Sequence, residues 1–254
     1  MSGAADAAFA EFALRLGDNA LVLGQRLSAW TGHAPIVEED LALTNVALDL
    51  IGQARMWLAL AGELEARDRD DDALAYFRDA HEYRNVLLVE RPNGNFADTM
   101  ARQFLFDAWQ FFLMRELGAS SDERVAGIAQ KTLREVAYHV RRSGDWVVRL
   151  GDGTDLSRKR MQTALDDLWP YTGELFASDA IDRELAARGI GCELESLREP
   201  WSEHVRRICA EATLTVPADG WMHAGGRAGR HTEELSYVLA EMQSVRRSVP
   251  GDRW

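Results

Sequence analysis

Cysteine, proline and long uncharged runs are all scarce in this 254-residue chain. Its two cysteines, Cys192 and Cys209, are too few for a disulfide framework or a paired metal-binding knuckle, and two free thiols suit a reducing cytosol. The longest stretch without Asp, Glu, Lys or Arg, Leu27–Val37, is far shorter than the roughly 20 apolar residues of a membrane-spanning helix. Because the N-terminus also lacks a basic start followed by an apolar run, we expect no signal peptide and a cytoplasmic protein.

Basic residues are outnumbered as well. The chain has 29 Lys and Arg against 41 Asp and Glu, which gives a net charge of -12. A diffuse negative field repels phosphate backbones, so nucleic acid is not an expected partner. A local basic patch could still meet an anionic ligand or an acidic partner surface.

The six prolines leave room for long helices, and apolar residues recur at steps of three and four rather than alternating. We predict an all-α, ferritin-like four-helix bundle with additional C-terminal helices, in one domain covering 1–254. The long helices are predicted at about 7–30, 38–65, 96–117 and 122–150, so the core bundle covers about 7–150. A shorter helix is predicted at about 73–90, and additional helices at about 157–249, within 157–187, 195–212 and 231–249.

Acidic and other polar residues interrupt the apolar stripes of these helices. Asp107 lies among apolar residues of the third long helix, and Glu135 and His139 do so in the fourth. The second helix adds Asp49 and Gln53, and the first adds Asp18. A buried, unpaired carboxylate costs several kcal/mol, so these side chains must be paired, hydrogen-bonded, protonated or bound to metal.

Carboxylates and a histidine from four helices are the residue types that bind iron in a di-iron carboxylate site. Such a site needs a Glu-x-x-His pair on each of two helices. The sequence contains no Glu-x-x-His; its nearest forms are Glu135-x-x-x-His139 and Asp49-x-x-x-Gln53. Three interpretations remain open: a degenerate polar core network without metal, a weak or non-standard metal site, and unrelated charges on helix surfaces. In the first, the set is Asp18, Asp49, Gln53, Asp107, Glu135 and His139.

A second polar segment precedes the last predicted helix. The loop 225–231 is rich in glycine and contains Arg227, Arg230 and His231. It fails the G-x-x-x-x-G-K-[ST] pattern of nucleotide-binding loops. One interpretation is a basic surface loop or a contact between subunits, and the other is contact with an anion such as a CoA phosphate or an acidic partner.

Several segments resemble one protein family. The resemblance is carried by Leu14–Asn19, Gly32–Pro35, Asp49–Arg55, Leu88–Thr99, Glu135–His139, Leu150–Asp155, His231–Leu235 and Glu241–Gln243. These segments are similar to the C subunits of bacterial 1,2-phenylacetyl-CoA epoxidases, which are phenylacetyl-CoA monooxygenase complexes of aerobic phenylacetate catabolism. The matches follow the same order along nearly the whole chain.

The resemblance implies a ferritin-like fold and a hetero-oligomeric complex. It implies a related A-type subunit that carries the di-iron centre and binds the CoA thioester, and a reductase subunit with NADPH, flavin and iron–sulfur cofactors. The C subunit would be structural, with no cofactor, no metal and no catalytic residue of its own.

Three hypotheses follow. In the first, the chain is a non-catalytic scaffold of the epoxidase. In the second, Asp18, Asp49, Asp107, Glu135 and His139 form a di-iron centre, and the chain is itself an oxygenase subunit. In the third, the chain is a ferritin-like binding protein without an oxygenase partner.

Overall fold

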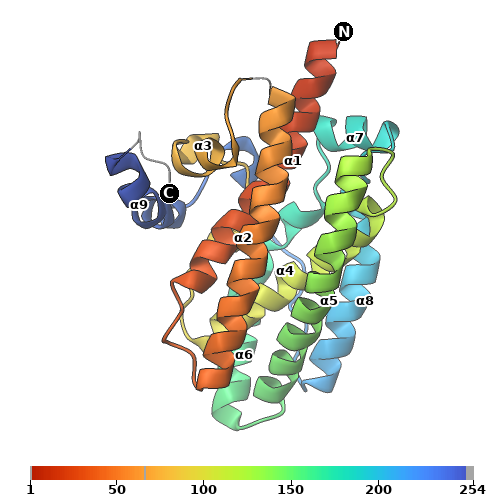
Figure 1. The fold of residues 1–254 in the computed structure, drawn as a ribbon. Helices are drawn as coiled ribbons and strands as arrows, with labels where there is room; N and C mark the ends of the chain where they lie inside the picture. Colours follow the sequence, from red (N-terminus) through yellow and green to blue (C-terminus); the bar gives the residue numbers. More distant parts are fainter. Residues whose placement is uncertain (1, 66, 250–254) are drawn as a thin grey trace. The chain divides into compact units, whose positions relative to one another are not determined.

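The computed structural model describes the backbone of residues 2–65 and 67–249, and side chains from residue 7 onward. Over these residues the chain forms nine α-helices, six short 3₁₀ helices and no strand (Figure 1). This content confirms the predicted all-α, ferritin-like fold class. None of the helices in the described ranges is long and apolar enough to cross a membrane.

The chain divides into two compact units. The first contains residues up to Glu90 together with those from Gly225 onward, and the second contains Arg91–Ala224. The first unit is therefore discontinuous in sequence, because its last helix returns to it after the whole of the second unit. That both units belong to one folding domain stays a prediction.

The first unit is built on the pair α1 (Ser2–Ser28) and α2 (Val37–Glu65), which pack along each other. Apolar side chains at helical spacing are buried in both, as the sequence predicts; they include Phe12, Leu16, Leu23, Leu27, Leu43, Val46, Leu50 and Trp57. Glycine in α1 allows the close approach: a Cβ at Gly17 would lie 2.7 Å from Cδ2 of Leu58. Glu38, Glu39 and Asp40 occupy the first turn of α2, where the helix dipole favours negative charge.

The segment after α2 differs from the prediction of a helix at about 73–90. It forms only α3 (Asp71–Tyr76) and the 3₁₀ helices η1 (Ala80–Glu82) and η2 (Leu87–Glu90). The reason is that side chains of α1 accept hydrogen bonds from backbone N–H groups that would otherwise donate to carbonyls within a helix. The carboxylate of Asp18 accepts the N–H of Arg84 (2.8 Å), and the amide oxygen of Asn19 accepts that of Val86 (2.8 Å).

The C-terminal helix α9 (Glu233–Ser248) follows η6 (Gly226–Ala228) and packs against α1, α3 and η1. Its Gln243 is buried and donates to the backbone oxygens of Ala75 (3.3 Å) and Arg78 (3.0 Å). These are carbonyls of the irregular segment, which have no regular helical partner. The tail of the chain thus satisfies polar groups in its N-terminal part.

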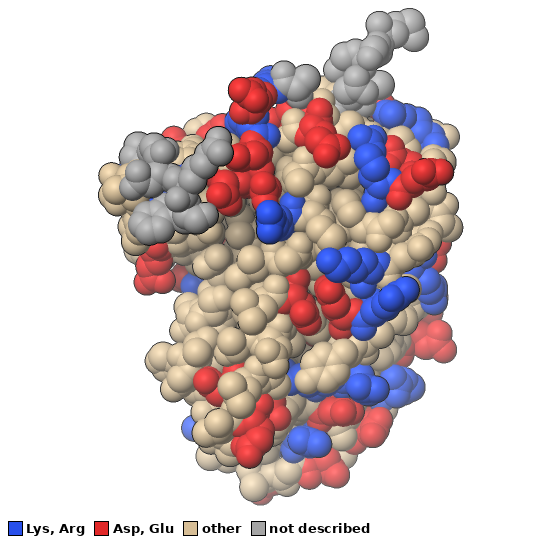
Figure 2. All heavy atoms as spheres, viewed as in Figure 1, with Lys and Arg blue, Asp and Glu red and all other residues tan. Residues whose placement is uncertain are grey.

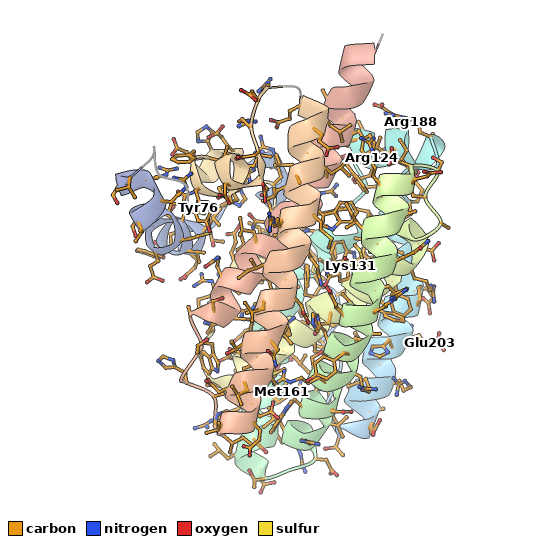
Figure 3. The ribbon with its side chains drawn as sticks, viewed as in Figure 1. Tyr76, Arg124, Lys131, Met161, Arg188 and Glu203 are labelled. Carbon is orange, nitrogen blue, oxygen red and sulfur yellow. The ribbon has the colours of Figure 1, made fainter. Side chains whose placement is uncertain are left out.

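The second unit is built on α4 (Phe96–Leu117) and α5 (Glu123–Gly151), each close to its predicted bounds. Asn95 begins α4 with a capping box that Asp98 completes, and Asp122 caps α5. Two further helices, α6 (Asp155–Leu168) and α8 (Arg198–Glu211), each pack against both α4 and α5. The solvent side of α5 carries exposed cations such as Arg124 and Lys131 (Figure 3).

The predicted helical stretch at 157–187 is interrupted. After α6 the chain makes η3 (Trp169–Tyr171) and η4 (Gly173–Phe176) before α7 (Ala180–Ala187), and η5 (Leu194–Leu197) leads into α8. Pro170 lacks the N–H that an α-helix needs at this point. The capping box of Asp179 and Asp182 then starts α7 afresh.

Candidate functional site

Asp18, predicted as part of the polar core site, is fully buried in the first unit. Arg78 holds it with two hydrogen bonds: Nη1 donates to Oδ2 (2.9 Å) and Nη2 donates to Oδ1. The backbone N–H of Arg84 adds a third. Both carboxylate oxygens are therefore occupied by donors from this chain, and a guanidinium stands where a cation could otherwise bind.

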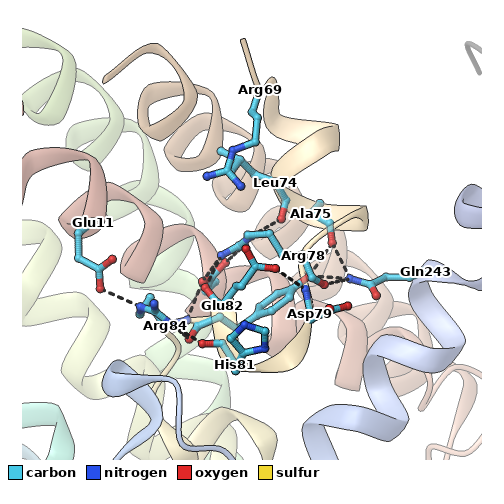
Figure 4. A network of polar contacts seen from close by, with 12 residues as sticks. Glu11, Arg69, Leu74, Ala75, Arg78, Asp79, His81, Glu82, Arg84 and Gln243 are labelled. Carbon is cyan, nitrogen blue, oxygen red and sulfur yellow. Dashed lines mark hydrogen bonds and ion pairs between the residues drawn. The ribbon is translucent and has the colours of Figure 1, made fainter. Parts of the chain in front are cut away.

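Arg78 is the centre of a larger network (Figure 4). Its guanidinium also donates to the backbone oxygens of Leu74 (2.5 Å) and Glu82 (3.1 Å), and it lies over the ring of Tyr83 at 4.2 Å. Burial by itself lowers the pKa of this guanidinium, but the charge and hydrogen bonds of Asp18, together with Tyr83 and Glu82, more than offset burial, so the pKa lies above its ordinary value. The network therefore fixes an ion pair between α1 and the segment that follows α3.

Asp49 and Gln53 lie one turn apart on α2, as predicted from their spacing. Gln53 is completely buried, whereas Asp49 is only half-buried. An amide is a poor iron ligand, and the Glu-x-x-His spacing counted from Asp49 would need an imidazole at position 52, where the chain has Gly52. The structure therefore gives α2 no strong metal-binding pair.

Asp107 forms a second polar cluster, in the second unit. It is fully buried on α4, where Gln103 Nε2 donates to Oδ1 (2.6 Å) and Ser143 Oγ donates to Oδ2 (2.8 Å). Burial raises the pKa of Asp107 to about 6. The nearby charges of His139 and Arg142 act in the opposite direction, as do the two hydrogen bonds.

Glu135 and His139 lie one turn apart on α5. His139 is buried, at 1% exposure, and close enough to Asp107 to affect its charge state. Glu135 is half-buried rather than enclosed in the core. Further along α5, Arg142 is buried and Arg141 is exposed.

The structure thus groups the six predicted residues by unit. Asp107 and His139 come together in the second unit with Glu135 one turn away, while Asp18, Asp49 and Gln53 belong to the first. A single polar centre drawn from four helices stays a prediction. Within either unit, the described His, Cys, Asp and Glu side chains form no group of three that could hold a metal ion.

His231, one of the three residues of the predicted anion or partner contact, has its side chain buried in the first unit. The side chain of His231 is 4% exposed, with Nδ1 2.5 Å from Glu90 Oε1 and Nε2 2.9 Å from the backbone oxygen of Tyr83. Both ring nitrogens are therefore occupied by internal oxygens. The sequence could not show this, because Glu90 is 141 residues away.

Glu90 is the centre of this contact and was missed by sequence reasoning. It is fully buried, and its carboxylate also accepts Asn85 Nδ2 (2.9 Å), the N–H of Thr232 (2.9 Å) and the hydroxyl of Thr232 (2.7 Å). This anion faces the start of α9, where a helix favours negative charge. Its role is to hold α9 in place.

The other two residues of the predicted contact, Arg227 and Arg230, are accessible to solvent. Arg227 is half-buried, and Arg230 is exposed. Contact of these two residues with an anion or a partner stays a prediction.

The cysteines offer no reactive group. Both are free, and burial raises the pKa of the Cys209 thiol to about 11 and that of Cys192 to about 12. A nucleophilic cysteine needs a lowered pKa, because the thiolate is the reactive form. Cysteine chemistry is therefore not supported at either position.

The comparisons with known proteins agree with the fold. The model of the family of phenylacetic acid catabolic proteins (PaaA_PaaC) matches residues 1–254, the whole chain. The chain belongs to this family. Within the family, it is 50% identical over 243 residues to the C subunit of the 1,2-phenylacetyl-CoA epoxidase of Escherichia coli (strain K12). That match covers 96% of this chain and 98% of the relative, so the resemblance seen in the sequence is confirmed over nearly its full length.

The family contains both A-type and C-type proteins, so the residues must show whether a di-iron centre fits here. They do not fit it. Asp18 is hydrogen-bonded to Arg78, and Asp107 to Gln103 and Ser143. On α2, the residue one turn after Asp49 is the amide Gln53. Ligand carboxylates would have to exchange these internal donors for metal ions.

Proposed function

We propose that this chain is a non-catalytic structural subunit of a phenylacetyl-CoA epoxidase, where it pairs with the di-iron catalytic subunit in aerobic phenylacetate catabolism. The proposal is supported by full-length similarity to a protein named as the C subunit of that enzyme. Ring epoxidation, the iron and the CoA thioester would then belong to the A-type partner, and the electrons would come from NADPH through a reductase subunit.

The observation that carries the non-catalytic role is the ion pair between Asp18 and Arg78. Both partners are buried, since their side chains are 0% and 2% exposed. A metal ion bound to Asp18 would displace the guanidinium and leave it buried without its counter-charge. Breaking a buried pair in this way costs about 3–5 kcal/mol, so the folded chain disfavours iron at this carboxylate.

Metal analysis of the chain purified alone tests this proposal. After anaerobic incubation with ferrous iron, exposure to air and desalting, we expect less than one iron per chain and no oxo-bridged absorption. The matched control is the A-type subunit treated in the same way. Stoichiometric iron with that absorption in the isolated chain would favour the oxygenase hypothesis instead.

Co-purification tests the pairing. An untagged form of this chain is expected to elute with a tagged A-type subunit in a fixed ratio. If the two proteins elute separately at micromolar concentration, the chain is not a subunit that pairs with A, and a stand-alone binding protein becomes the better explanation.

A further inference from the structure

The first half of α2 exposes a row of large apolar side chains. Val37 is 71% exposed, Leu41 60% and Leu48 61%. At about 100° per residue, these three lie within roughly 40° of one another around the helix axis. Ile36, directly before the helix, is also exposed, so the row continues to the start of α2.

No other helix in the described part of the chain exposes three large apolar residues. Single exposed leucines are normal on protein surfaces, but several large apolar side chains exposed on one side of a single helix are typical of an interaction site, although Thr44 and Asn45 separate Leu41 from Leu48 here. We call Ile36, Val37, Leu41 and Leu48 the α2 surface.

The loop beside the α2 surface is held in one conformation by its own contacts. The N–H of Gly32 donates to Asp40 Oδ1 (2.7 Å), and the hydroxyls of Thr31 and Thr44 lie 3.4 Å apart. Gly32 has a φ of +87°, which disfavours any side chain there. The apolar row therefore lies on an ordered support, and binding to it would require little further ordering.

The sequence segment that carries the α2 surface has charges of one sign. Residues 27–54 include no Lys or Arg, although the chain has 29 of them, and Glu38, Glu39 and Asp40 lie in the first turn of α2. Figure 2 shows this part of the surface, over the start of α2, as mostly uncharged with acidic groups. A second copy of the chain would bring the same acids to the contact, so self-association here is disfavoured by charge repulsion.

We propose that the α2 surface is the docking site for the catalytic subunit of the epoxidase. The complementary surface on that subunit has an apolar centre and a rim of Lys or Arg. This inference rests on the proposed function, because only the proposed function supplies a catalytic partner subunit. Buried apolar anchors carry most of the binding energy in such contacts, and Leu41 and Leu48 are the anchors here.

Substitution of the anchors tests the docking site. In Leu41→Gln/Leu48→Gln, the side chains become polar while helix propensity is kept, so circular dichroism and the melting temperature should match the wild type. The matched control is Leu156→Gln/Tyr237→Gln, which changes two residues of similar exposure, 59% and 62%, on α6 and α9. The affinity of each protein for the purified A-type subunit is measured by interferometry, with sedimentation of each chain alone.

We expect the α2 variant to bind the A-type subunit at least about tenfold more weakly than the wild type, with the control unchanged. Equal binding by all three proteins would overturn the docking site and leave the proposed function intact. No binding by the wild type would overturn the proposed function itself. Loss of a homo-oligomer in the α2 variant, with unchanged affinity for the A-type subunit, would show a self-interface and also overturn the proposal.

Discussion

Two buried aspartates, 89 positions apart in the sequence, are stabilised by different means. Asp18 pairs with the guanidinium of Arg78, whereas Asp107 is stabilised first by the charge of His139 and then by hydrogen bonds from the neutral donors Ser143 and Gln103. For Asp107, the cost of burial outweighs these contributions, so its pKa is raised. The two residues are therefore expected to respond differently to substitution.

For Asp107, stability should depend on pH in a definite window. Its pKa in the folded chain, about 6, lies above the ordinary 3.8, so the folded state binds the proton more tightly than the unfolded state. The stabilisation is complete below pH 3.8 and is lost as the pH rises to about 6, in total about 3 kcal/mol. Asp107→Asn removes this titration. Between pH 4 and pH 7, the free energy of unfolding of the variant, relative to that of the wild type, should therefore rise by up to about 3 kcal/mol. Urea unfolding at both pH values measures the difference, and parallel pH profiles would contradict it.

For Asp18, removing the charge should be costly. Asp18→Asn leaves the buried guanidinium of Arg78 without its counter-charge, and the expected loss of unfolding free energy is about 3–5 kcal/mol. Glu11→Gln is the control, since it breaks pairs with Arg84 and Arg15 in which the acid is 24% exposed, and it should cost clearly less than Asp18→Asn.

A double-mutant cycle checks the cause of this loss. The pair Asp18→Asn/Arg78→Met should be less destabilised than the sum of its two single variants by at least about 1 kcal/mol. Simple additivity would mean that the guanidinium is stabilised by its backbone contacts instead.

At the scale of elements, the long helices follow from local sequence, and the connections do not. α4 begins at Asn95 and α5 at Asp122, where capping residues lie next to apolar periodicity. The segment after α3 has enough helix-forming residues to predict a helix at 73–90, yet it is irregular. Its backbone donors bond to Asp18 and Asn19 of α1, and this competition is not visible in a local pattern.

The attachment of α9 depends on Glu90. In Glu90→Gln, one oxygen becomes an amide N–H₂ that opposes donors of Thr232 or His231, so the start of α9 should loosen. We expect faster hydrogen exchange over α9 with little change over α4 and α5. Glu233→Gln is the control, because Glu233 lies in the same first turn of α9 but is exposed. Uniform acceleration in all helices would instead indicate global destabilisation.

At the scale of the whole molecule, the chain is predicted to fold as one domain, although it packs as two compact units. Calorimetry can decide this. We expect a single transition whose calorimetric and van't Hoff enthalpies agree. In Asp18→Asn, fluorescence from the tryptophans of the second unit, such as Trp109 and Trp201, should follow the same lowered transition. Two resolved transitions, with only one shifted, would show that the units fold independently.

Family membership was also accessible from the sequence, because the resembling segments run along nearly the whole chain. The absence of Glu-x-x-His is likewise a property of the sequence alone, and it pointed to a degenerate site before any contact was known. The partners of that site were less accessible. Arg78, Gln103 and Ser143, which bond to Asp18 and Asp107, are not predicted from the sequence.

The sequence by itself determined the long helices, the fold class and the residue types available to the candidate site. Each depends on spacing of three or four residues or on composition, which a single chain displays directly. The tertiary structure decided that Arg78 holds Asp18, that His231 turns inward to Glu90, and that α9 belongs with α1. These contacts join residues 60 to more than 140 positions apart, and no local periodicity specifies which of many buried donors and acceptors will meet.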